Sequence, residues 1–105
     1  MIDSAKLKAA CMDIGHRCAA NLSSADHLIR FTDVEIGTVF RDGHPEFCVT
    51  FRFEDPIRGR FTCANFIDVG LFDCGAMPGD AFETSLRERC EILLFGDKAT
   101  PNSAR

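Results

Sequence analysis

The amino-acid sequence predicts an α+β domain in which a helix, three antiparallel strands and a second helix follow one another along the chain. Three observations lead to this fold class. Two segments, one near each end, repeat apolar residues at the three- and four-residue spacing of an amphipathic helix. Between them, three runs alternate apolar and polar residues, as half-buried strands do. The runs are joined by short turns, which is typical of a meander of neighbouring antiparallel strands.

The first helix is predicted over residues 4–21, where either Asp3 or Ser4 can act as the N-cap. One face of this helix carries an apolar stripe made of Leu7, Cys11, Ile14, Cys18 and Leu22. Gly15 interrupts the helix and costs it about 1 kcal/mol relative to alanine. A glycine in this position indicates either the close approach of another backbone or simple tolerance.

The three strands are predicted over residues 34–41, 46–54 and 60–66, with turns over 42–45 and 55–59. The second strand has the clearest alternation. One of its faces carries Phe47, Val49, Phe51 and Phe53. We expect this face to form the floor of the core, because successive side chains of a strand point to opposite sides of the sheet.

Residues 67–79 mix apolar residues with three glycines and a proline, and we expect a short helical turn followed by a loop. The second long helix is predicted from Asp80 to about Phe95, with Glu83 and Arg87 as an i,i+4 ion pair. Its expected apolar stripe consists of Phe82, Leu86, Cys90, Leu93 and Leu94.

Both helices are expected to pack on one face of the sheet, leaving the face with Thr50, Arg52 and Thr62 for solvent or a partner. A three-stranded sheet has two edges whose backbone groups lack strand partners. The first strand has no proline or lysine, and the third strand is similarly unguarded. We therefore expect a homodimer that forms through a sheet edge, unless residues 67–79 fold back over that edge.

The chain has 105 residues, enough for one modest core, and we expect a single domain over residues 1–96 with a frayed tail over 97–105. Its six cysteines raise the question of a disulfide scaffold. No basic region followed by an apolar run begins the sequence, and several cysteines occupy core positions of the predicted elements. We expect free buried thiols and a cytoplasmic location.

Metal binding and catalysis are both weakly supported by the sequence. The cysteines contain no CxxC pair, and His16 and Cys18 point about 200° apart on a helix, which disfavours a shared zinc ion. Cys74 is the one cysteine in a loop-like setting, but its neighbour Asp73 opposes formation of a thiolate. We expect no enzyme, no cofactor and no metal, and keep a metal- or ligand-binding domain that uses some cysteines as an alternative.

Nucleic-acid and membrane binding are not expected. The element order is also that of double-stranded RNA-binding domains, but those domains present a basic second helix, whereas this one carries Glu83, Glu88 and Glu91 against two arginines. The net charge of −4 likewise opposes phosphate binding. No stretch approaches the roughly 20 apolar residues that span a bilayer.

The function that remains is binding without catalysis. We expect a protein-binding module that serves as an inhibitor, immunity or accessory factor, with a self-associating structural domain as the alternative. The candidate partner-binding residues are the charged side chains Glu35, Arg52, Arg58, Arg60 and Asp73.

Overall fold

The computed structural model describes residues 4–23, 28–75 and 77–95 of the chain. The elements are α1 (Ser4–Leu22), β1 (Arg30–Arg41), β2 (His44–Asp55), β3 (Gly59–Asp68), α2 (Val69–Asp73) and α3 (Asp80–Phe95). The predicted fold class and element order are confirmed, and α2 is the short helical turn expected within residues 67–79. The tail expected over 97–105 lies outside the described residues.

The three strands form one antiparallel sheet in the order β1-β2-β3. Asp42 and Gly43 connect β1 to β2 with positive φ angles of 52° and 79°, which suits a two-residue hairpin turn that matches the twist of the strands. This turn is shorter than the predicted 42–45, because His44 and Pro45 pair with the end of β1. Both strands therefore extend to the tip of the hairpin.

β1 also begins four residues earlier than predicted, at Arg30. A bulge between Phe31 and Asp33 explains the difference. The extra residue at the bulge interrupts the alternation of apolar and polar side chains, so the pattern before Val34 does not resemble a strand.

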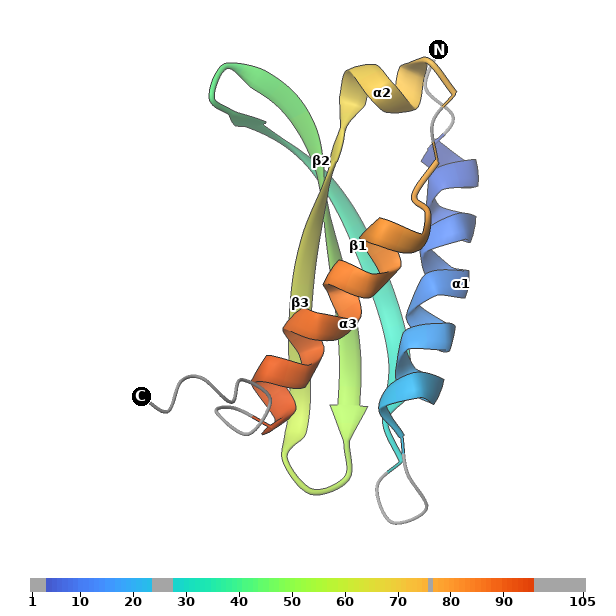
Figure 1. Ribbon diagram of the computed structural model, residues 1–105, viewed down its shortest axis with the longest axis vertical. Helices are drawn as coiled ribbons and strands as arrows, with labels where there is room; N and C mark the ends of the chain where they lie inside the picture. The colour runs from blue at the N-terminus through green and yellow to red at the C-terminus, as the bar shows by residue number, and fades with distance from the viewer. Residues whose placement is uncertain (1–3, 24–27, 76, 96–105) are drawn as a thin grey trace.

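The core lies between the two long helices and one face of the sheet (Figure 1). α1 packs mainly against β1 and α3 packs against β3, and the helices also contact each other. The predicted floor of the core is confirmed, because Phe51 is fully buried and its neighbours on that face are buried with it. The α1 stripe is confirmed in full: Leu7, Cys11, Ile14, Cys18 and Leu22 are all buried.

Gly15 is a point of close approach, although the segment that approaches is a side chain rather than a backbone. A Cβ atom on Gly15 would lie 2.5 Å from Cε1 of Phe31. The Phe31 ring sits edge-on to His16 and packs against Phe53, so α1 meets the beginning of β1 through this ring.

Two predictions for α3 are wrong. Leu93 is 57% exposed. The buried face of the helix follows Leu86, Cys90 and Leu94, and Leu93 lies beside this face rather than on it. Glu83 bonds to Arg17 of α1, with 2.9 Å between Arg17 Nη2 and Glu83 Oε1, rather than to Arg87. The contact between the two helices supplies a partner that sequence spacing does not reveal.

In the described part of the chain, neither long helix has the length and apolar character that crossing a membrane requires.

Candidate functional site

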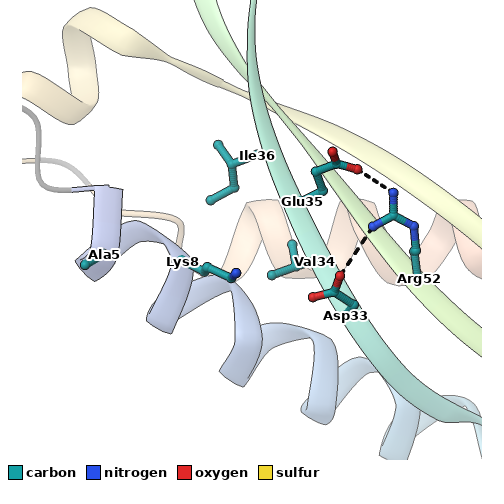
Figure 2. Close-up of a pocket in the computed structure, with 7 residues that line it drawn as sticks. All are labelled: Ala5, Lys8, Asp33, Val34, Glu35, Ile36 and Arg52. Atoms are coloured by element: carbon teal, nitrogen blue, oxygen red, sulfur yellow. Dashed lines mark hydrogen bonds and ion pairs between the residues drawn. The ribbon is translucent and has the colours of Figure 1, made fainter.

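A groove of about 610 Å³ runs between the N-terminal half of α1 and the free edge of β1. Ala5 and Lys8 line it from the helix, and the segment 33–36 lines it from the strand. Figure 2 shows Val34 and Ile36 on the α1 side of β1, where their side chains meet the core. The groove therefore has an apolar floor beside an open strand.

The opposite side of β1 carries a compact charge cluster. Arg52 of β2 bonds to Glu35, and its Nη1 lies 3.5 Å from Asp33 Oδ2, as the dashed lines of Figure 2 show. The hydrogen bond to Glu35 raises the pKa of the Arg52 guanidinium. Two candidate partner-binding residues, Glu35 and Arg52, are thus brought together at the groove, but they pair with each other.

The other three candidates are not part of this groove. Arg58 lies in the β2–β3 turn, where its Nη1 is 3.4 Å from the carboxylate of the buried Asp55. Arg60 is exposed near the beginning of β3, and its Nε lies 3.6 Å from Glu54 Oε2. Asp73 is exposed at the end of α2. The predicted set is therefore spread over several places rather than forming one site.

The edge of β3 is guarded in its middle, contrary to the expectation from sequence. Arg89 of α3 donates from Nη1 to the backbone carbonyl of Ala64, at 2.9 Å. The side-chain oxygen of Asn65 accepts from the backbone N–H of Phe66, at 3.0 Å, while its amide nitrogen donates to the carbonyl of Phe82 on α3. Side chains therefore satisfy outward backbone groups in the middle of β3.

These contacts also fix which residues of β1 face outward. In an antiparallel sheet both hydrogen-bonding groups of a residue point to the same side, and successive residues alternate. The backbone groups of Ala64 and Phe66 point away from β2, so the backbone groups of Asn65, which lies between them, form hydrogen bonds to β2. Carried through the two strand registers, this places the N–H and C=O groups of Val34, Ile36, Thr38 and Phe40 at the free edge of β1.

The free edge of β1 is open along this length. No side chain of the described residues bonds to the outward backbone groups of β1 beyond Asp33, in contrast to β3. The tip of the β1–β2 hairpin also runs clear of α1 (Figure 1). Phe40, near its tip, is 74% exposed. A second strand can therefore approach β1 without displacing any described element.

Three buried thiols meet in the core, away from this edge. The Cys90 thiol donates a hydrogen bond to Cys63, with 3.1 Å between the two Sγ atoms, and it also forms a hydrogen bond with the Cys18 thiol. These hydrogen bonds and burial raise the pKa of Cys90, and the bond from Cys90 lowers the pKa of Cys63. Burial raises the pKa of Cys11 to about 11. All six cysteines are free.

The structure gives no support to the metal-binding alternative. Among the residues that it describes, no three histidine, cysteine or acidic side chains are arranged to hold a metal ion. His16 packs on the Phe31 ring, His44 is exposed in the hairpin, and His27 lies outside the described residues. Cys74 is exposed at the end of α2.

Comparison with known proteins reveals no relationship, since no family model, no curated protein and no solved structure matches the chain. The function must therefore be inferred from the chain's own geometry.

Sequence reasoning found Glu35 and Arg52 but missed the groove residues Ala5 and Lys8, and the closure of β3 by Arg89. The alternation of β1 gave a usable signal for the groove floor, because Val34 and Ile36 share a face. Nothing in the local sequence marks Ala5, Lys8 or Arg89, which reach the sheet only through tertiary packing.

Proposed function

We propose that this protein is a non-catalytic protein-binding module that takes up an extended segment along the free edge of β1. The observation that carries the proposal is the difference between the two edges of the sheet. Arg89 and Asn65 satisfy two outward backbone groups in the middle of β3, whereas the outward groups of β1 have no such contacts among the described residues. Binding by strand addition uses these backbone groups for affinity and neighbouring pockets for specificity.

The groove beside β1 supports this mode of binding. A segment that pairs with Val34 and Ile36 would direct every second side chain towards Ala5 and Lys8 of α1. The apolar floor favours an apolar or aromatic side chain there. On the other side of the sheet, Asp33, Glu35 and Arg52 give the segment charged neighbours of both signs.

Such a module fits an inhibitor, immunity or accessory factor, because its binding surface needs no catalytic group. We place it in the cytoplasm, since free thiols persist in a reducing compartment and all six cysteines are free. The second candidate is a self-associating structural domain. It is favoured by the exposed Phe40, which lies on the same strand as the open edge.

Two matched proline variants test the proposal. Thr38 and Thr62 are both exposed, and each directs its N–H outward from an edge strand, so proline removes no bond to β2 in either case. Each tagged variant is used as bait in a lysate of the native host, and captured proteins, including the untagged host copy, are identified by mass spectrometry. Circular dichroism checks that both variants fold.

We expect Thr38→Pro to lose the captured protein and Thr62→Pro to retain it. A protein that both variants capture, or that both lose, would mean that β1 is not the binding edge.

A further inference from the structure

We propose that the strand that occupies the free edge of β1 is β1 of a second copy of this chain, paired antiparallel about a two-fold axis at Gly37. The inference rests on the proposed function, because it names the occupant of the same edge. It is carried by three independent features of the described residues: the position of α1, the outward backbone groups, and the side chains that the pairing brings together.

The position of α1 limits where the two-fold axis can lie. α1 runs alongside β1 from Ile29 to Ile36, with Ala19 near the first of these residues and Ala5 near the last. The axis is perpendicular to the sheet, so the second copy places its own α1 on the same face. The two helices avoid each other only when the axis lies beyond Ile36. An axis at Gly37 meets this condition and pairs residues 33–41 of one copy with residues 33–41 of the other.

Hydrogen bonding is satisfied in this register. Val34 of one copy stands opposite Phe40 of the other, and Ile36 stands opposite Thr38. All four residues direct their N–H and C=O groups to the free edge, so each opposed pair exchanges both bonds. A shift of the register by one residue would pair these residues with positions that already bond to β2.

The side chains agree with the same register. Phe40 is 74% exposed in the single chain, and in the pair it lies beside Val34 of the second copy, at the groove of about 610 Å³ lined by Ala5 and Lys8. The ring enters the groove, and the two-fold axis repeats the contact. On the other face of the sheet, Asp33 stands opposite Arg41, so the two ends of the paired segment carry opposite charges. In the single chain the Arg41 guanidinium contacts Glu46 and lies over the Phe66 ring, so it must turn towards the edge to reach Asp33. At the axis, Gly37 of one copy lies opposite Gly37 of the other.

The mass in solution gives the first test. Light scattering behind size exclusion, at tens of micromolar, should give twice the chain mass of 11.6 kDa.

Phe40→Ser should raise the dissociation constant of the dimer at least about tenfold, because two rings lose their burial. The matched control is Ile57→Ser in the β2–β3 turn, where the side chain is 72% exposed, and it should leave the constant unchanged.

A cysteine at the axis tests the register. A Cβ atom on Gly37 would meet no atom within 4 Å, so Gly37→Cys fits the single chain. In the proposed pair the two Cα atoms are about 4.5 Å apart, within the range that a disulfide spans. Cys48 stands opposite position 37 within one chain and would compete for the new thiol, so the variant is made in a Cys48→Ser background. Under oxidised glutathione, Gly37→Cys in this background should form a covalent dimer whose link peptide mapping places at position 37. Val39→Cys is the control, because its two copies would be more than about 13 Å apart.

The outcomes separate the inference from the proposed function. A monomer at every concentration, or a Gly37→Cys variant that forms no link at position 37, overturns the second copy as the occupant. If Thr38→Pro still abolishes the capture of a different host protein, β1 remains the binding edge and only its occupant is wrong. If the protein is a dimer that Phe40→Ser and Thr38→Pro leave intact, the two copies associate elsewhere, and the proposed function fails as well when Thr38→Pro also retains every other protein that Thr62→Pro captures.

Discussion

Gly15 shows how one missing side chain joins α1 to the sheet. Alanine favours a helix over glycine by about 1 kcal/mol, so Gly15→Ala would stabilise an isolated helix. Here the new Cβ atom would lie 2.5 Å from the Phe31 ring, which itself packs against Phe53. Overpacking costs about 1–3 kcal/mol, so we expect a net loss of stability. Urea unfolding measures it, with Gly79→Ala as the control, since a Cβ atom there would meet nothing within 4 Å. A gain for Gly15→Ala would mean that the ring moves aside freely.

The thiol of Cys11 predicts a dependence of stability on pH. Burial raises the pKa of Cys11 from 9.0 to about 11. Between these values the unfolded chain releases the thiol proton while the folded chain retains it, so folding binds a proton. The free energy of unfolding should therefore fall as pH rises from about 9 towards 11.

The measurement is a series of urea titrations over that pH range, for the unmodified protein and for Cys11→Ala. The variant loses stability at every pH because a buried group is removed, but its free energy of unfolding should fall less steeply with pH. Parallel slopes for the two proteins would mean that Cys11 does not contribute to the alkaline loss.

At the scale of elements, β2 is the centre of the fold. Phe51 is fully buried between the rings of Phe31 and Phe82, whose centroids lie 6.3 Å and 6.1 Å away. Phe51→Ala should cost about 3–5 kcal/mol, a large share of the roughly 5–15 kcal/mol of a small domain. Arg52→Ala removes only exposed ion pairs and should cost less than about 1 kcal/mol. Thermal unfolding at one fixed protein concentration compares the two, and similar melting temperatures would contradict the assignment of the inner face.

The elements could largely be predicted because their signals are local. The stripe of α1 and the alternation of β2 are periodic in the sequence, and both are buried as expected. The start of β1 could not be predicted in the same way, because the bulge after Phe31 breaks the alternation. Leu93 was misplaced for a related reason. A stripe that contains both Leu93 and Leu94 is wider than the face that the helix buries.

The candidate site was harder to predict because it depends on contacts between distant segments. Ala5 and Lys8 become groove residues only when α1 lies along β1. Arg89 closes the edge at Ala64, 25 residues away in the chain, so no local pattern distinguishes the closed β3 from the open β1. Charge alone selected Arg58, Arg60 and Asp73, which the structure leaves in separate places.

At the scale of the whole molecule, the sheet is asymmetric. α3 covers one face, and its Arg89 satisfies the outward carbonyl of Ala64 on β3, where Asn65 of the same strand satisfies the N–H of Phe66. α1 covers the same face, and within residues 4–23, 28–75 and 77–95 the edge of β1 stays open beside a groove. Natural sheets protect their edges against pairing with other chains, so an edge that is left open while the other is closed favours a role in binding.

Hydrogen exchange of single amides by NMR tests this asymmetry most directly. In the Phe40→Ser variant, at a concentration where light scattering gives the mass of one chain, the amides of Ile36 and Thr38 should exchange rapidly, whereas those of Gly37 and Val39, which hydrogen-bond to β2, should be protected. The amide of Phe66 on β3 should also be protected, because the Asn65 side chain accepts its bond. In the unmodified protein at high concentration, Ile36 and Thr38 should become protected as well. If both amides are already protected in the monomer, β1 is not the open edge of this sheet. If they stay unprotected at every concentration, the second copy is not the occupant of that edge.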